Sequence, residues 1–259
     1  MTPAEAVPGL PPGYRLLAFD SLPSTNATAL ERAAAGDPAG TVVWARHQTG
    51  GRGRRGRSWE SFAGNLYASI LLRPACDLTA AAQLGFVAAL AVAEGVAALA
   101  PGLPPLALKW PNDVLLGGRK VAGVLLESIQ GAEGRPSALA VGVGVNIAGF
   151  PDTETAGYPA TALHSEAAAA HIDADTLLSS LVRCFETGRA RWAAEGFAPV
   201  RAAWLARAKG LGKPIAVRLP QESRHGIFQD LDEAGALCLA TSEGKIARIT
   251  VGEVFFGQA

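Results

Sequence analysis

Three apolar runs in the middle of the chain restrict what it can fold into more than any other feature. They span Leu106 to Leu116, Arg119 to Gln130 and Ser137 to Ile147, and glycine-rich segments at residues 117–118 and 131–134 separate them. Short glycine turns between β-rich runs are typical of hairpin-connected strands. The pattern therefore predicts an antiparallel meander.

Alternating strands and helices surround this meander. Strands are expected at Tyr14–Phe19, Thr41–His47 and Asn65–Leu72, and helices from Ser24 to Gly36, from about Asp77 to Leu99 and from about Asp173 to Ala208. Ser24 has the side chain of a helix N-cap, because its hydroxyl can accept from a backbone N–H of the first turn. These elements predict one large domain of mixed helix and sheet.

The composition changes after Gly210, where only short strands follow. They are expected at Pro214–Leu219, His225–Leu231, Ala236–Ala240 and Ile246–Val251. Such short strands with turns between them predict a small β-barrel-like module. The expected division is a flexible lead-in at 1–13, a large domain at 14–209 and a small C-terminal β domain at 210–259.

Composition and charge exclude several classes of protein. With 49% hydrophobic and 18% charged residues and a formal net charge of +0, the chain is typical of a globular protein without a general attraction to nucleic acid or membranes. Its three cysteines are scattered, which argues against a disulfide framework or a zinc site. The apolar stretch around Ala80–Ala100 has polar breaks and predicts a buried helix. No signal peptide is recognisable, so we expect a cytoplasmic protein.

Residues 50–59 form a glycine-arginine segment with four arginines among four glycines, ending at Trp59. Glycine lets backbone N–H groups approach an anion, and arginine forks bind carboxylate or phosphate through two bonds. The segment predicts binding of a ligand with several negative charges, such as a nucleotide polyphosphate, with Trp59 as an aromatic wall. It is no Walker P-loop. An RNA-binding basic segment is the alternative, although its place between two apolar strands counts against that reading.

A second polar group interrupts the meander at Lys109, Asn112 and Asp113, where Pro111 must break or bulge the strand. Lysine can hold a phosphate, and Asp113 could help to place a magnesium ion. The alternative is a surface turn with an ion pair. Lys120 begins the next strand, where it either faces water or reaches into a pocket.

Three further positions are candidates for ligand contacts. Gly123 offers close backbone access, and Asn146 ends an apolar strand in which its amide needs a partner. Ser24-Thr25-Asn26 is explained by helix capping, but its hydroxyl and amide groups also suit a small polar ring such as a ureido group. Gln48 could join them.

Taken together and in this order, these segments resemble the catalytic core of the biotin protein ligase family. The resemblance covers residues 14–165 and rests on Ser24-Thr25-Asn26, Gly51-Arg52-Gly53-Arg54-Arg55-Gly56-Arg57-x-Trp59, Lys109-Trp110-Pro111-Asn112-Asp113, Arg119-Lys120-x-Ala122-Gly123 and Gly142-x-Gly144-x-Asn146. It implies an α+β fold, with a mixed-sheet catalytic domain followed by an SH3-like barrel. The segment from Ala148 to His164 matches only loosely, so adenine contacts there stay unassigned.

The family resemblance also implies the reaction and its residues. Biotin and ATP would form biotinyl-5′-AMP and pyrophosphate, and a lysine of a biotin carboxyl carrier protein would then take the biotin. Biotin would be bound by Ser24, Thr25, Asn26, Gln48, Gly51, Arg52, Gly53, Arg54, Lys120 and Gly123, and ATP or the adenylate by Arg54, Arg55, Arg57, Trp59, Lys109, Asn112, Asp113, Lys120 and Asn146. Lys120 and Arg54 are the expected catalytic residues. Arg52 and Arg54 would lie over the biotin carboxylate and the α-phosphate.

The resemblance sets expectations for partners as well. Mg²⁺ is expected with ATP, with Asp113 as its candidate ligand, and no tightly bound prosthetic group is expected. With only about 13 residues before the first strand, no DNA-binding domain and no repressor role are expected. A monomer or a homodimer would fit. A lipoate ligase or octanoyl transferase, which shares the catalytic fold, and a non-enzymatic RNA-binding protein are the rival readings.

Overall fold

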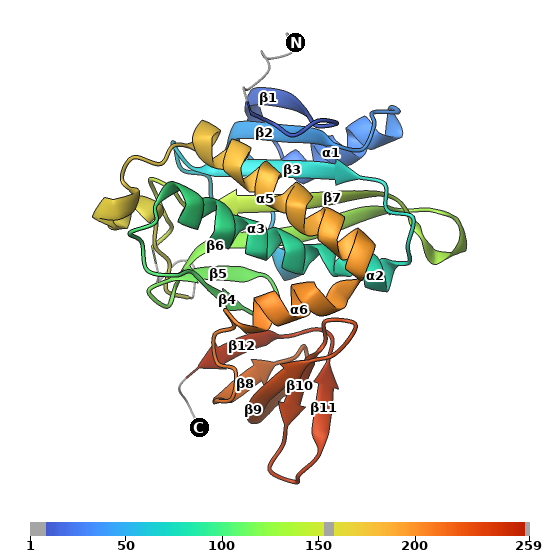
Figure 1. The fold of residues 1–259 in the computed structure, drawn as a ribbon, viewed down its shortest axis with the longest axis vertical. Helices are drawn as coiled ribbons and strands as arrows, with labels where there is room; N and C mark the ends of the chain where they lie inside the picture. Colours follow the sequence, from blue (N-terminus) through green and yellow to red (C-terminus); the bar gives the residue numbers. More distant parts are fainter. Residues whose placement is uncertain (1–8, 153–157, 257–259) are drawn as a thin grey trace.

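The structure is a computed structural model that describes residues 9–152 and 158–256. It contains a seven-stranded sheet in the order β1-β2-β3-β7-β6-β5-β4 and a five-stranded sheet in the order β11-β10-β9-β8-β12 (Figure 1). Most of the predicted lead-in, part of the loosely matching segment and the last three residues lie outside the described residues.

The large sheet is mixed, as predicted. Its strands are β1 (Arg15–Leu22), β2 (Thr41–Gln48), β3 (Leu66–Leu72), β4 (Ala107–Lys109), β5 (Asp113–Leu116), β6 (Arg119–Gln130) and β7 (Pro136–Val145). β1 and β2 are parallel, and the other neighbours pair antiparallel. The β5-β6-β7 meander is confirmed. The break or bulge predicted at Pro111, within the run from Leu106 to Leu116, is confirmed: the chain reverses there, and β4 and β5 form a hairpin.

Alternation along the central strands gives the sheet two different faces. In β7, Val141, Val143 and Val145 pack into the main hydrophobic core, whereas Ala140 packs under α1 (Thr25–Ala34) on the opposite face. Gly142 and Gly144 share the face of Ala140 because side chains alternate along a strand. The valines of the Val-Gly-Val-Gly-Val segment therefore build the core, and its glycines leave space on the α1 face.

The main core lies between the sheet and the helices on its other face. α2 (Leu78–Ala82), α3 (Leu84–Leu99) and α5 (Ala174–Glu195) cover that face, and α6 (Phe197–Leu205) leads toward the smaller sheet (Figure 1). Each of the two long helices predicted from sequence is in fact two. The first is interrupted at Gln83, and the second breaks at Gly196, whose φ of 76° is incompatible with a helix.

The stretch Leu78–Leu99 is the one segment of the described residues that is long and apolar enough to cross a membrane, by length and composition only. Its α3 portion packs against α5 and the sheet, and most of its side chains are buried in the protein. The prediction of a buried core helix is therefore confirmed.

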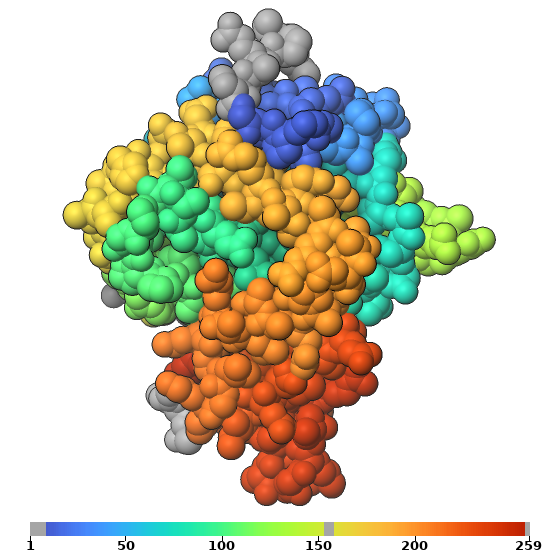
Figure 2. All heavy atoms as spheres, viewed as in Figure 1, coloured from blue at the N-terminus to red at the C-terminus, as the bar shows by residue number. Residues whose placement is uncertain are grey.

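The smaller sheet forms a separate lobe next to α6 (Figure 2). Its strands are β8 (Pro214–Arg218), β9 (Ser223–Leu231), β10 (Leu237–Ala240), β11 (Ile246–Ile249) and β12 (Glu253–Phe256), all paired antiparallel. The sequence did not predict β12 as a strand of its own. By pairing with β8, β12 places Glu253 within hydrogen-bonding distance of Arg57 in the glycine-arginine segment.

Candidate active site

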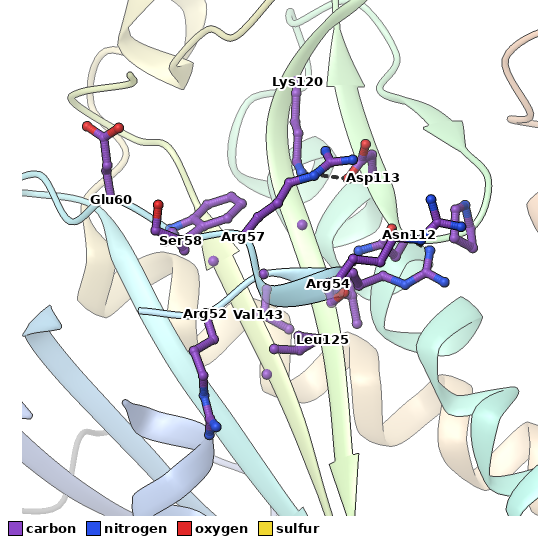
Figure 3. Close-up of a pocket in the computed structure, with 18 of the residues that line it drawn as sticks. Arg52, Arg54, Arg57, Ser58, Glu60, Asn112, Asp113, Lys120, Leu125 and Val143 are labelled. Atoms are coloured by element: carbon purple, nitrogen blue, oxygen red, sulfur yellow. Dashed lines mark hydrogen bonds and ion pairs between the residues drawn. The ribbon is translucent and has the colours of Figure 1, made fainter. Parts of the chain in front are cut away.

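A cavity of about 300 Å³ opens on the α1 face of the large sheet, where the glycine-arginine segment crosses β6 and β7 (Figure 3). Its walls contain every site residue predicted from sequence except Gly51. The residues come from the start of α1, the end of β2, the glycine-arginine segment, the β4–β5 turn, β6, β7 and β12. Tertiary folding thus brings together five motifs that are distant in the sequence.

The glycine-arginine segment folds into a small hairpin of its own. Its ends are joined by hydrogen bonds from Trp59 N to Gly51 O at 2.9 Å and from Gly53 N to Arg57 O at 2.7 Å. The turn is the 3₁₀ segment η1 (Arg54–Gly56), in which Arg55 adopts a φ of 58°. A Cβ at Gly51 would lie 2.4 Å from the Trp59 carbonyl oxygen, so Gly51 serves the hairpin rather than the cavity wall.

Trp59 lies on a platform made of two glycines in adjacent strands. Gly123 of β6 and Gly144 of β7 are directly opposite each other, and a Cβ on either would lie within 3.0 Å of the indole ring. The indole Nε1 is buried and has no hydrogen-bond partner in the part of the chain that the structure describes. Gly123, which was expected to bind biotin, lies beneath Trp59 and next to Lys120.

Asp113 lies between two lysines at the upper end of the cavity. Its carboxylate oxygens are 2.7 Å from Lys120 Nζ and 3.6 Å from Lys109 Nζ, and all three side chains are largely buried (Figure 3). Burial raises the pKa of the Asp113 carboxyl, but the two lysine charges outweigh burial and hold this pKa below its ordinary value. Burial lowers the pKa of Lys120, and the Asp113 charge outweighs this effect and raises it. Both groups are therefore charged at neutral pH.

Lys120 is held over two aromatic rings as well. Its Nζ lies 5.3 Å from the Trp59 ring centroid and 4.9 Å from that of Tyr158, within the range of cation–π attraction. Sequence analysis missed Tyr158, because it lies within the segment from Ala148 to His164, which matches the family only loosely. Asn146, whose amide needed a partner, donates to Thr161 O at 3.1 Å.

Arg54 has no carboxylate partner among the ion pairs of the described residues. Its closest polar contact is Asn112 Oδ1, at 3.5 Å from Nη1, while the Asn112 amide donates to Val124 O at 2.7 Å. Burial, followed by repulsion from Arg55, lowers the pKa of Arg54. A largely buried guanidinium whose charge is balanced by no carboxylate among the described ion pairs favours binding of an anion in the cavity.

Arg52 and Arg54, both expected over the biotin carboxylate and the α-phosphate, have side chains that point in different directions (Figure 3). The Arg52 side chain points away from Arg54 and Arg57, and its Nη2 lies 3.2 Å from Glu127 Oε1. Glu127 also accepts from Asn26 Nδ2 at 2.8 Å. Arg52 therefore borders the polar end of the cavity, which lies at the start of α1. Arg54 and Arg57 border the other end, which contains Lys109 and Lys120.

At this polar end, Ser24 caps α1 as predicted, because its hydroxyl accepts from Ala27 N. Gln48 lines the cavity, and its Oε1 accepts from Thr25 N at 2.8 Å. The cavity is thus neutral and polar at one end and strongly cationic at the other.

The C-terminal sheet contributes to the cavity through Glu253. Arg57 Nη1 donates to Glu253 Oε1 at 3.0 Å, and a second bond joins the same two side chains. This bidentate pair joins β12 to the hairpin formed by the glycine-arginine segment, called the arginine hairpin below. Sequence analysis missed Glu253 because β12 itself was not predicted.

Cations outnumber carboxylates in the cavity wall. The cations are Arg52, Arg54, Arg55, Arg57, Lys109 and Lys120, and the carboxylates are Glu60, Asp113 and Glu253. Within residues 9–152 and 158–256, no group of three or more His, Cys, Asp or Glu side chains could hold a metal ion. The arrangement suits a ligand that is neutral and polar at one end and carries several negative charges at the other.

A ligase that joins a small carboxylic acid to a nucleotide is the class of protein that this mixed sheet and this cavity define. Residues 18–146 match the model of the biotin/lipoate A/B protein ligase family, and residues 210–257 match the model of the biotin protein ligase C-terminal domain.

Individual relatives agree with these matches. The chain is 46% identical to the biotin--[acetyl-CoA-carboxylase] ligase of Paracoccus denitrificans over 90% of this chain and 97% of that protein. It is 36% identical to the bifunctional ligase/repressor BirA of Bacillus subtilis over 95% of this chain and 75% of that protein. Its structure matches the Aquifex aeolicus biotin protein ligase in complex with biotin and ATP with a TM-score of 0.77 and 30% identity, covering 93% of this chain and 97% of that one. The chain belongs to the biotin protein ligase family.

Proposed function

We propose that this chain is an ATP-dependent biotin protein ligase that activates biotin as biotinyl-5′-AMP and transfers it to a lysine of a biotin carboxyl carrier protein. In the first step a biotin carboxylate oxygen attacks the α-phosphorus of ATP, and the bond to the β-phosphate breaks to release pyrophosphate. In the second step the lysine amine attacks the acyl carbon, loses a proton and releases AMP.

One observation carries this proposal: the two ends of the cavity differ in charge. The neutral end offers Ser24, Thr25 and Gln48 to a ureido ring, and the cationic end offers Arg54 and Lys120 to two anions. A carboxylate and a triphosphate repel each other, so the reaction needs positive charge held where they meet. Family membership supports the same reading.

In this proposal Lys120 stabilises the charge that develops between the carboxylate and the α-phosphate. Its charged state and its place within 2.7 Å of Asp113 suit that role. Arg54 and Arg57 neutralise the phosphates, and Lys109, Asn112 and Asn146 border the adenylate. Trp59 covers the junction. Gly51 and Gly53 shape the hairpin, and Arg55 lies at its tip.

Asp113 does not fit a direct magnesium ligand in the arrangement described here. Both of its oxygens are paired with lysine ammonium groups, and among the described residues no other carboxylate belongs to this cluster of ion pairs. Mg²⁺ is proposed only as the companion of the ATP phosphates, which can supply its oxygen ligands. Asp113 acts here as the residue that orients the two lysines.

The acceptor is proposed to be the carrier domain of an acetyl-CoA carboxylase, and the compartment to be the cytoplasm. The acceptor proposal is supported by the names of the Paracoccus denitrificans and Mycobacterium tuberculosis relatives, both biotin--[acetyl-CoA-carboxylase] ligases. Absence of operator-specific DNA binding remains a prediction, as does a monomeric or dimeric state.

The decisive experiment incubates the purified protein with ATP and Mg²⁺ and either biotin or lipoate, and follows pyrophosphate release and bound adenylate. Biotin-dependent pyrophosphate and a retained biotinyl adenylate are expected. Turnover with lipoate alone would keep the fold and overturn the substrate. Turnover with neither acid would overturn the proposal.

A further inference from the structure

A chain of buried hydrogen bonds runs behind the neutral end of the cavity. Ser69 of β3, which no motif includes, is completely buried and does not line the cavity. Its Oγ lies 2.6 Å from Asn26 Oδ1 and 2.8 Å from Thr25 Oγ1. Thr25 is a wall residue, so Ser69 contacts the ligand site only through its neighbours.

The direction of this chain is fixed at its far end. The Asn26 amide nitrogen lies 3.1 Å from Leu125 O and 2.8 Å from Glu127 Oε2, two groups that can only accept. Both N–H bonds of Asn26 are therefore used within the protein, and its oxygen must face Ser69. A Cβ at Gly142 would lie 2.4 Å from that oxygen, so the glycine provides the space for this amide.

The remaining proton positions follow from counting donors. Asn26 Oδ1 can only accept, so the single Ser69 proton points to it. The 2.8 Å contact between Ser69 and Thr25 then requires the Thr25 proton. The competing acceptor, Gln48 Oε1, lies 3.1 Å from Thr25 Oγ1, beyond the usual range of an O–H···O bond, and already accepts from Thr25 N.

We propose that Asn26 and Ser69 are positioning residues that hold the Thr25 hydroxyl as a hydrogen-bond acceptor toward the ligand. Its proton is directed into the protein, so only its lone pairs face the cavity. The Gln48 amide nitrogen beside it remains a donor. The neutral end therefore selects a ring that carries an N–H donor opposite Thr25, and this selection rests on the proposed biotin ligase function.

The test compares biotin with the two cyclic carbamates in which one or the other ureido N–H is replaced by oxygen. A ring oxygen opposite Thr25 would leave two acceptors facing each other in a buried site, which is costly. We expect the wild-type protein to bind one carbamate at least about tenfold more weakly than biotin, as measured by titration calorimetry.

Ser69→Ala removes the acceptor for the Thr25 proton without altering the cavity wall. We expect Ser69→Ala to reduce severalfold the ratio of the Kd of the weakly bound carbamate to the Kd of biotin. The variant should also raise KM for biotin, while kcat and KM for ATP stay nearly unchanged. Ser180→Ala is the matched control, because Ser180 is also buried but donates to Gly95 O between α3 and α5. The second carbamate serves as an internal control, since its ratio to biotin should not respond.

Thr25→Val provides the second variant. It should reduce the same ratio of carbamate Kd to biotin Kd. If Ser69 acts through Thr25, adding Ser69→Ala to Thr25→Val should not change this ratio further. An unchanged ratio in Ser69→Ala, or additive effects in the double variant, would overturn the inference while leaving the ligase function intact. A wild-type protein without biotin-dependent pyrophosphate release would overturn both.

Discussion

At the scale of single residues, the cluster of Lys109, Asp113 and Lys120 explains why charged groups survive in a largely buried place. A buried charge is tolerated when it is paired, and here one carboxylate neutralises two ammonium groups in part. The excess positive charge is left for a ligand. The charges of this cluster therefore affect both the stability of the fold and the proposed adenylate formation. Each effect can be tested with its own variant.

Lys120→Ala should abolish most adenylate formation. Loss of one group that stabilises charge in a transition state typically lowers the rate by about 10²- to 10³-fold. The measurement is single-turnover biotinyl-AMP formation at saturating biotin and ATP. Lys245→Ala, which removes an exposed lysine paired with Glu243, is the control. Adenylate formation at the wild-type rate would remove Lys120 from its proposed role.

Asp113→Asn should lower the free energy of unfolding by roughly 3 kcal/mol at neutral pH, because two buried lysines lose their counter-charge. The pKa of Asp113 is lowered in the folded protein, so its stabilising effect is present above its unfolded pKa, about 3.9, and is lost as pH falls through the folded value. The difference between wild type and variant should therefore shrink below about pH 4.

Urea unfolding at a series of pH values measures this difference. Asp20→Asn is the control, because the Asp20 side chain is 98% exposed and its replacement should change stability little at any pH. A difference between wild type and Asp113→Asn that grows with acidification would contradict the sign of the shift.

At the scale of elements, the arginine hairpin and β12 form one unit although almost two hundred positions of sequence separate Arg57 from Glu253. The hairpin has its own backbone bonds, and Arg57 at the end of its turn makes the one ion pair between the hairpin and the smaller sheet among the ion pairs of the described residues. Because the Arg57 side chain is about half exposed, solvent weakens the pair and it adds little to global stability. Its effect should instead appear in local opening of the hairpin.

Glu253→Ala should speed hydrogen exchange at the Gly53 and Trp59 amides, whose bonds close the hairpin, while changing the free energy of unfolding by less than about 1 kcal/mol. Exchange of a peptide covering residues 50–60, read by mass spectrometry, tests this. Glu222→Ala breaks an exposed pair with Arg224 elsewhere in the small sheet and should leave that peptide unchanged. Unaltered protection in Glu253→Ala would show that the pair does not restrain the hairpin.

At the scale of the whole molecule, the two sheets share one hydrophobic core. Phe86 of α3 packs edge-on against Phe197 and Trp204 of α6, and Trp110 donates to Gly235 O in the smaller sheet. Gln83 donates to Glu233 O across the same boundary. The smaller lobe is therefore coupled to the catalytic sheet by apolar packing as well as by Arg57.

This shared core predicts that both sheets unfold together. All five tryptophans lie within residues 14–209, so their fluorescence follows the large domain, whereas far-ultraviolet circular dichroism follows both sheets. Urea unfolding measured by the two signals should give coincident transitions. Gly235→Val would place a side chain against Phe86, because a Cβ there would lie 2.6 Å from the Phe86 ring and the residue has a φ of 84°. We expect that variant to unfold earlier and to separate the two transitions. Two transitions in the wild type would contradict a common core.

Local patterns in the sequence determined the mixed fold class, the β5-β6-β7 meander, the Ser24 cap and many of the residues of the cavity wall, but not Tyr158 or Glu253. These features depend on residue type and on spacings of a few residues, as in the alternating Val and Gly of β7. The breaks at Gln83 and Gly196 were predicted less well, because packing decides whether an apolar run continues.

Only the tertiary structure decided which partners meet. Register places Ser69 opposite Gly142 and Gly142 opposite Leu125, and docking of the smaller sheet places Glu253 against Arg57. The orientation of Arg52 toward Glu127 and the direction of the Thr25 hydroxyl follow from those contacts. Hydrogen bonds and ion pairs act over a few ångströms, so they depend on distances in space, which the order of residues along a chain does not contain.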